Sequence, residues 1–132
     1  ALAGKGYAPV FLIGPQEREW LATLRAAVPQ ALFPEAEPVD PALGISRLEF
    51  AIALGRRLTA VVANDSGVGH LMAAIGTPLV SLFGPSDAAR WAPFGERVVI
   101  VRAQDFGGAA MESIPVDAVN TAVDRLLASS GK

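Results

Sequence analysis

The residues best suited to chemistry lie together between Val61 and His70, in the stretch VVANDSGVGH. Its apolar beginning predicts a buried strand, Asp65 to Gly69 predict a tight turn, and Gly69 to Ile75 predict a short helix. A helix that directly follows a strand presents unpaired backbone N–H groups and the positive end of its dipole at one point. Such a point favours anions, phosphate groups among them. We therefore expect an anion site here, although an ordinary strand-to-helix turn would produce the same pattern.

This turn offers several kinds of group to a diphosphate. Backbone N–H groups and the Ser66 hydroxyl can donate hydrogen bonds, and its two glycines, Gly67 and Gly69, allow positive φ and let a ligand approach the backbone. His70 can neutralise phosphate charge as an imidazolium. Asp65 would be repelled by phosphate, so we expect it to accept bonds from sugar hydroxyls or to cap the helix. The expected binding residues here are Asp65, Ser66, Gly67, Val68, Gly69 and His70.

The composition excludes several classes of protein. The chain has 132 residues, of which 52% are hydrophobic, as expected for one globular α/β domain. A net charge of -2 provides no basic surface for nucleic acid. Without cysteine, and with His70 as the single histidine, the sequence offers no disulfide and no histidine- or thiolate-rich metal site, so we expect neither metal nor cofactor. No apolar run approaches the roughly 20 residues that span a bilayer, and no signal peptide is evident, so we expect a cytoplasmic chain.

The rest of the chain alternates strands with helices. Strands are predicted at Val10–Ile13, Thr59–Ala63, Leu79–Phe83 and Val98–Val101, and helices at Gln16–Val28, Arg47–Arg57, Gly69–Ile75 and Val116–Ala128. Ser46 and Glu49 form a capping-box pattern where the second helix starts. The Pro-rich residues 29–44 are predicted to be mostly loop, and the Gly-rich residues 104–110 a mobile loop. This alternation predicts right-handed βαβ units in an α/β fold, a Rossmann-like and mainly parallel sheet with helices on both faces.

The predicted sheet also indicates where a ligand would bind and which side chains form the core. Ligands of open parallel sheets bind beyond the carboxyl ends of the strands. The loops at 14–17, 65–70 and 84–87 all fall on this edge and are expected to converge there. Helical periodicity predicts apolar stripes that face the sheet. The stripes contain Trp20, Leu21, Leu24 and Val28 in the first helix, Leu48 and Ile52 in the second, and Val116, Val119, Val123, Leu126 and Leu127 in the last.

The segment from Asn64 to Gly95 closely resembles the signature of glycosyltransferase family 9, which contains the ADP-heptose:lipopolysaccharide heptosyltransferases. The matching pieces are NDSGVGH, AAIGTP, LFGPSD and WAPFG, all in register. This resemblance implies the C-terminal half of a GT-B glycosyltransferase, a class with two Rossmann-like domains, with the first strand and most of the first helix absent. Residues 1–132 would then be a partial C-terminal nucleotide-sugar-binding domain.

The resemblance further implies a reaction. The whole protein would be an inverting, metal-independent transferase, with ADP-heptose as donor and lipopolysaccharide core as acceptor. It would work in the cytoplasm, with peripheral association at the inner face of the bacterial inner membrane possible only for the full-length protein. The family's proposed catalytic base is an aspartate of the N-terminal domain, through which the acceptor also binds. Because these residues lack that domain, we expect the fragment alone to be inactive.

The same resemblance implies roles for residues outside the central turn. Glu17 matches a carboxylate that holds the ribose of the nucleotide, although a solvated charge at a helix start would look the same. Ile45 and Ser46 fall where the family places its adenine-contacting loop. By the same match, Asp65 would contact the donor sugar. Three further residues match the motif, but they would shape a loop and the interdomain face more than they touch the donor: Asp87, Arg90 and Trp91.

Two other functions fit parts of the pattern. A dinucleotide-binding oxidoreductase would explain the G-x-G at Gly67 and Gly69, with Asp87 placed 20 residues past Gly67 to bind a ribose. Met72, however, occupies the third small position of that fingerprint, where a bulky side chain would obstruct close helix–strand packing. The second alternative is a non-catalytic interaction module, a function that a fragment without the N-terminal half could have.

Overall fold

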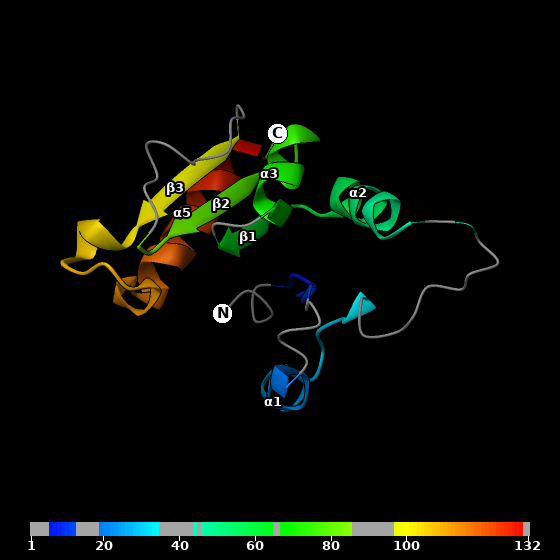
Figure 1. Cartoon of the computed structure of the whole chain (residues 1–132), viewed down its shortest axis with the longest axis horizontal. Helices are drawn as coiled ribbons and strands as arrows, with labels where there is room; N and C mark the ends of the chain where they lie inside the picture. Colours follow the sequence, from blue (N-terminus) through cyan, green and yellow to red (C-terminus); the bar gives the residue numbers. More distant parts are fainter. Residues whose placement is uncertain are drawn as a thin grey trace. The chain divides into compact units, whose positions relative to one another are not determined.

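The computed structural model describes residues 6–12, 19–34, 44, 46–64, 67–85 and 97–130 (Figure 1). The chain divides into two compact units, Ala1–Ile45 and Ser46–Lys132. The first unit contains the helix α1 (Leu21–Ala27), and the second contains every named strand. The second unit consists of α2 (Arg47–Arg57), β1 (Val61–Asn64), α3 (Gly67–Ala74), β2 (Leu79–Phe83), β3 (Val98–Arg102), the 3-10 helices η5 (Ala103–Phe106) and η6 (Met111–Ser113), and α5 (Val116–Ser130).

A parallel sheet forms the centre of the second unit. Its strands lie in the order β1-β2-β3, and both pairs run parallel, with Val61 opposite Leu79 and Leu79 opposite Val98. The predicted parallel arrangement is therefore confirmed, and β1 and β2 do not form a hairpin. The predicted bounds of β2 are confirmed, and β3 extends one residue further than expected. By contrast, β1 begins at Val61, two residues later than predicted, and ends at Asn64.

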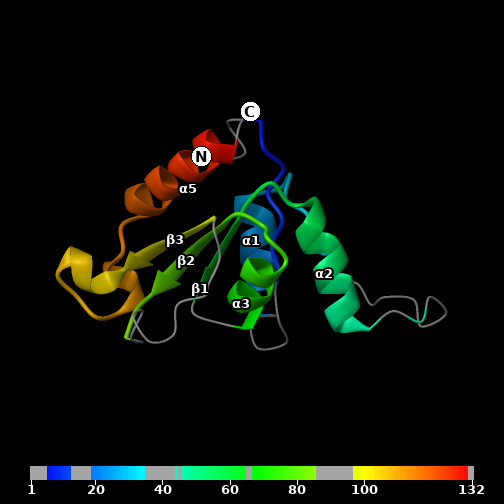
Figure 2. The ribbon, with the colours of Figure 1, turned by 90° about the horizontal axis from the view of Figure 1, so that it is seen from above.

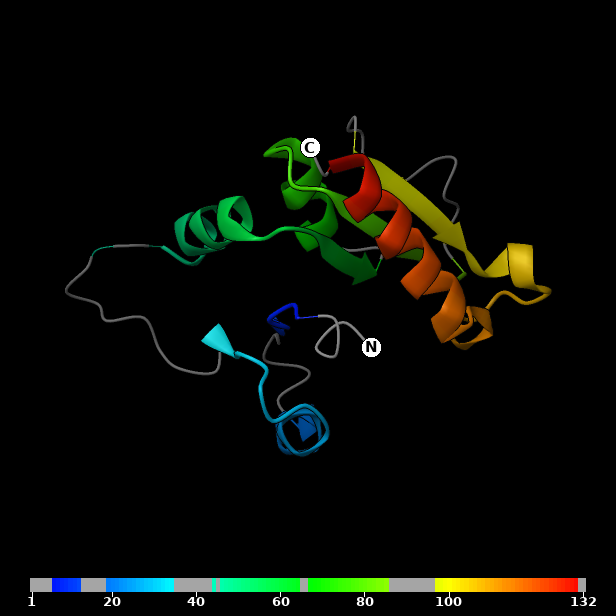
Figure 3. The ribbon, with the colours of Figure 1, turned by 180° about the vertical axis from the view of Figure 1, so that it is seen from behind.

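Helices cover both faces of this sheet, as predicted. In Figure 2 the strands lie between α3 on one side and α5 on the other. Seen from behind, α5 lies across β2 and β3 (Figure 3). The buried core reflects this layering, because Leu79, Val80 and Phe83 of β2 have no exposed surface, while Val123 and Leu126 of α5 are only 3% exposed. The central strand is thus apolar on both faces, which is typical of a parallel strand with helices on either side.

Close contacts join α2 to α3. Gly55 in α2 is buried, and a side chain there would meet the Met72 Sδ and Ile75 Cδ1 atoms of the neighbouring segment. The buried Thr77 hydroxyl donates to the Gly55 carbonyl at 2.8 Å. Gly76 ends α3 with φ 83°, while its N–H donates to Ala73 and that of Thr77 donates to Met72. These paired bonds are a Schellman motif, so the predicted helix stop at Gly76 is confirmed.

The predicted capping box at the start of α2 is also confirmed. The Ser46 hydroxyl accepts from the Glu49 N–H at 3.1 Å, and the Ser46 N–H donates to Glu49 Oε1 at 3.0 Å. The backbone and side-chain hydrogen bonds with Ser46 hold the pKa of the Glu49 carboxyl below its usual value. Ser46 therefore organises the helix start, whatever contact it makes with a ligand.

The first unit departs from the prediction in its helix and its strand. The helix was expected over Gln16–Val28, but α1 spans Leu21–Ala27 after a 3-10 turn, and residues 13–18 lie outside the described part. The strand expected at Val10–Ile13 is represented by a single parallel bridge between Val10 and Leu32. Trp20 is 58% exposed and so does not belong to the predicted stripe.

Two further expectations are corrected in the second unit. Leu48 and Val116 were predicted to face the core, yet they are 59% and 74% exposed. Each lies in the first turn of its helix, where the apolar periodicity is the same but the side chain is not covered. The Gly-rich residues 104–110 were predicted to be a loop, but residues 104–106 belong to η5 and a left-handed Gly107 ends it. Among the described residues, no helix is long and apolar enough to cross a membrane.

Candidate functional site

The carboxyl edge of the sheet is the first candidate site, because two of the predicted loops leave from it. Since β1 and β2 are parallel and Asn64 lies opposite Leu82, the segments that follow both strands emerge at the same edge. The described parts of these segments are residues 67–70 and Gly84–Pro85. Residues 14–17, the third predicted loop, lie outside the described residues.

The helix α3 begins at Gly67, with only two residues between it and the end of β1 at Asn64. The N–H groups of its first turn belong to Gly67, Val68 and Gly69 and have no partner within the helix. The start was predicted two residues later, at Gly69. Both glycines are helical and absent from the glycines with positive φ, so neither uses the left-handed conformation that glycine allows.

The two glycines of α3 differ in their surroundings. Gly69 is buried, and a Cβ there would lie 3.7 Å from the Ala63 Cβ and 3.6 Å from the Asn64 oxygen. These are ordinary contact distances, so a small side chain would also fit there. A Cβ at Gly67 would meet nothing within 4 Å among the described residues, so there is space beside the start of α3.

His70 and Val68 lie on the surface of α3, Val68 with 40% of its side chain exposed. The structure thus brings Gly67, Val68, Gly69 and His70 together at the carboxyl edge, with the imidazole in the helical turn that carries the open N–H groups. The remaining predicted site residues lie outside the described part of the chain, and their roles stay predictions: Asp65, Ser66, Glu17, Ile45, Asp87, Arg90 and Trp91.

A second group at this edge was missed by the sequence analysis. The Gln104 Nε2 donates to the Gly84 carbonyl at 2.8 Å, which joins η5 to the end of β2. Gly84 is buried, and a Cβ there would lie 2.9 Å from the Met111 backbone nitrogen, so η6 also packs on this residue. The sequence carried no signal for these contacts, since they join positions about 20 residues apart without any periodic pattern.

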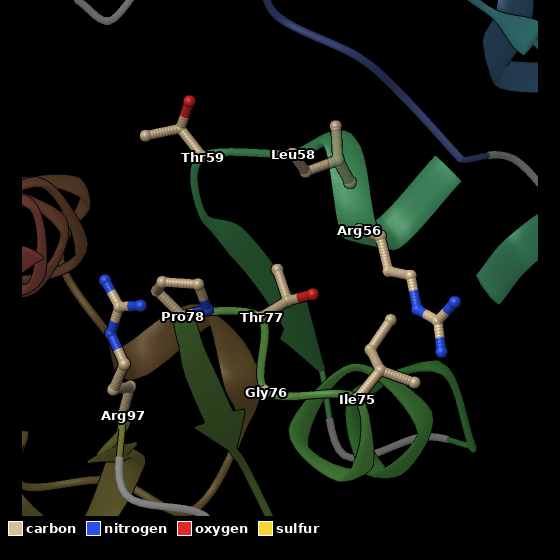
Figure 4. Close-up of a pocket in the computed structure, with 8 residues that line it drawn as sticks. All are labelled: Arg56, Leu58, Thr59, Ile75, Gly76, Thr77, Pro78 and Arg97. Carbon is tan, nitrogen blue, oxygen red and sulfur yellow. The ribbon is translucent and has the colours of Figure 1, made fainter. Parts of the chain in front are cut away.

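A shallow pocket of about 300 Å³ lies at the opposite edge of the sheet (Figure 4). Its lining includes Pro78 and Arg97, which directly precede β2 and β3, so it marks the amino ends of the strands. Figure 4 shows Arg56 and Arg97 on opposite sides of the pocket. The Thr77 hydroxyl on its wall already donates to Gly55. This pocket and the predicted anion site therefore lie at different edges, and we favour the carboxyl edge because a helix starts there with N–H groups that have no partner within the helix.

The described residues contain no group of three or more histidine, cysteine, aspartate or glutamate side chains placed to hold a metal ion. Residues 1–114 match the family model described as glycosyltransferase family 9 (heptosyltransferase). The chain belongs to this family. The resemblance seen in the signature between Asn64 and Gly95 is thereby confirmed.

Curated members of glycosyltransferase family 9 resemble the chain over much of its length. It is 35% identical over 102 residues to lipooligosaccharide heptosyltransferase 2 of Haemophilus influenzae, covering 76% of this chain and 28% of that protein. It is 30% identical over 141 residues to a lipopolysaccharide heptosyltransferase 3 of Escherichia coli, covering 98% of this chain and 40% of that protein. The chain therefore spans well under half the length of these relatives.

Solved structures of the family share the fold. The E. coli ADP-heptose lps heptosyltransferase II superposes with a TM-score of 0.79 at 24% identity, covering 99% of this chain and 39% of the other. The E. coli heptosyltransferase WaaC with ADP gives a TM-score of 0.78 at 23% identity, covering 95% of this chain and 36% of the other. The predicted fold class, a Rossmann-like part of a GT-B glycosyltransferase, is confirmed.

Proposed function

We propose that the chain is the donor-binding part of an inverting glycosyltransferase that uses ADP-heptose and acts on the lipopolysaccharide core. The observation that carries this proposal is the start of α3 at the carboxyl end of β1, where Gly67 has an open backbone and His70 is exposed. Open N–H groups and a helix dipole suit the diphosphate of a nucleotide sugar. Membership of a heptosyltransferase family and the ADP in a structural neighbour support the choice of donor.

Each binding residue has a defined role in this proposal. The backbone N–H groups of residues 67–69, together with the Ser66 hydroxyl, donate to diphosphate oxygens. His70 adds a donor and, when protonated, a positive charge. Asp65 accepts bonds from hydroxyls of the donor sugar, while Glu17 holds the ribose and Ile45 lies against the adenine.

The whole protein would need more than these residues for transfer. The segment that this chain matches makes up only 28% of one curated relative and 40% of another, so both relatives are much longer than the segment. We propose that the remainder supplies the catalytic base and the acceptor site, and that the 132-residue chain alone transfers no sugar. In this proposal the complete enzyme works in the cytoplasm, at the inner face of the bacterial inner membrane.

Titration of ADP against variants of the whole protein tests the site. His70→Ala should weaken ADP binding by about 1 to 3 kcal/mol, the usual value of a hydrogen bond that involves a charged group. Isothermal titration calorimetry of ADP against the parent and His70→Ala proteins measures this difference.

Arg56→Ala is the matched control, because Arg56 lines the pocket at the other edge of the sheet. It should leave ADP affinity unchanged. A loss with Arg56→Ala and none with His70→Ala would move the anion to the amino edge and overturn the assignment. Saturable micromolar binding of NAD in place of ADP would favour an oxidoreductase. The fully buried Met72 opposes that function, because it occupies the third fingerprint position, where a small residue allows close packing of helix on strand.

A further inference from the structure

The loop that follows β2 starts from a fixed point at the carboxyl edge. Its first residue, Gly84, is buried and lies against the backbone of Met111 in η6, where a Cβ would come within 2.9 Å of the Met111 nitrogen. The Gly84 carbonyl accepts a hydrogen bond of 2.8 Å from Gln104 Nε2 in η5. Two separate 3-10 helices therefore hold the residue from which the GPSD part of the family motif continues.

The chemistry of the Gly84–Pro85 peptide makes this hydrogen bond unusually important. Proline has no backbone N–H, so the carbonyl is the one polar group of this peptide unit that can be held. A hydrogen bond to that carbonyl fixes the orientation of the peptide plane.

The support behind Gln104 is itself well anchored. Ala103, at the start of η5, is fully buried. The Gly107 N–H donates to the Gln104 carbonyl, and the Gly108 N–H donates to that of Ala103, which closes the end of the helix. Because η5 is anchored in this way, the Gln104 side chain can hold the Gly84 carbonyl in one position.

We propose that Gln104 is a positioning residue for the donor site: through the Gly84 carbonyl it orients the Gly84–Pro85 peptide at the end of β2, at the edge where residues 67–70 face the donor. Parallel register places the ends of β1 and β2 side by side, so a reoriented Gly84–Pro85 peptide would change the space beside the start of α3. This inference rests on the proposed function, because it assumes that the donor lies at that edge.

Gln104→Met is the test variant, since methionine has a similar length but no N–H donor. In the whole protein we expect the donor KM to rise on the order of two- to tenfold, the effect of one neutral hydrogen bond. The acceptor KM should not change. Gln104→Glu should raise the donor KM further, because an ionised carboxylate opposes the carbonyl oxygen.

Asp105→Asn is the matched control on the same 3-10 helix. It breaks the pair with Arg102 but has no part in the bond to Gly84, so the donor KM should stay at the parental value. Thermal unfolding of all variants separates positioning from stability. Should Gln104→Met unfold at the assay temperature, Gln104→Glu and direct ADP titration at lower temperature take its place.

The outcomes separate this inference from the proposed function. A parent protein that binds no ADP would overturn both. A parent that binds ADP normally, together with Gln104 variants of unchanged donor KM and ADP affinity, would overturn the positioning role alone. A parallel rise in donor and acceptor KM, with a lowered melting temperature, would show that Gln104 only stabilises the fold, and would likewise overturn it.

Discussion

At the scale of single residues, the glycines near the carboxyl edge differ in how much room surrounds them. At Gly84 a Cβ would lie 2.9 Å from the Met111 backbone nitrogen, so the close packing there favours glycine. At Gly69 a Cβ would make ordinary contacts of 3.6 and 3.7 Å, and at Gly67 it would meet nothing within 4 Å among the described residues. Sequence alone shows only that all three positions are glycine, and the structure gives neither Gly67 nor Gly69 the positive φ that glycine allows.

Ser46 provides a prediction at the same scale. Ser46→Ala should lower the free energy of unfolding by about 0.5 to 2 kcal/mol, since it removes the side-chain acceptor of the Glu49 N–H. Urea titration of parent and variant, with equal slopes, measures this difference. An unchanged midpoint would mean that the first turn of α2 contributes nothing to global stability.

Glu49 makes the same cap sensitive to pH. Its carboxyl has a pKa lowered from 4.5 by hydrogen bonds with Ser46. A lowered pKa in the folded state stabilises the protein above pH 4.5, and this contribution is lost as the pH falls through the folded-state value. Glu49→Gln should therefore lose less stability than the parent between neutral and acidic pH. Glu112→Gln, at an exposed carboxylate in η6, is the control and should follow the parent.

At the scale of elements, the sequence was most informative where a local pattern and the tertiary environment agree. The bounds of α2 and β2 were predicted correctly, because a capping box starts the helix and an apolar run fills the strand. The helix faces were less predictable. Periodicity identifies which side of a helix is apolar, but not whether neighbouring elements cover its first turn, so Leu48 and Val116 were wrongly assigned to the core.

The last helix allows a test with an internal control. Val123 is 3% exposed, and Val123→Asp would bury a carboxylate among the apolar side chains of β2 and β3. We expect a loss of several kcal/mol, on the order of 3 or more, in the free energy of unfolding. Val116→Asp, at the 74% exposed first position of the same helix, should cost little, since an acidic side chain suits a helix N-terminus.

Thermal or urea unfolding of both variants checks the docking of α5. Equal stabilities of Val123→Asp and the parent would contradict the packing of α5 on the sheet. A large loss with Val116→Asp would mean that its first turn is covered in solution.

At the scale of the whole molecule, the candidate site was predictable in position but not in detail. Parallel strands place the ends of β1 and β2 at one edge, and this followed from the alternation of strands and helices alone. The bond between Gln104 and Gly84 did not, because it depends on how a 3-10 helix packs against a strand end. The identity of the donor and acceptor could not be predicted in detail either, because the curated relatives are much longer than the segment that this chain matches.

The division into two units leads to a final prediction about folding. Among the described residues, the apolar ones with no exposed surface lie in Ser46–Lys132; they are Met72, Leu79, Val80, Phe83 and Ala103. The capping box, the parallel sheet and α5 lie there as well. We therefore expect residues 46–132 to fold alone and to unfold in one cooperative transition, as small domains with a single core do.

Circular dichroism of the shortened chain should show both helix and strand signals, and these should disappear together with the near-ultraviolet signal on heating. Within this chain, Val123→Asp should lower the midpoint as it does in the full 132 residues, because its surroundings are unchanged. A shortened chain with helical signal but no cooperative transition would contradict the prediction. It would mean that residues 1–45 complete the core, and the second unit would then depend on the first for its stability.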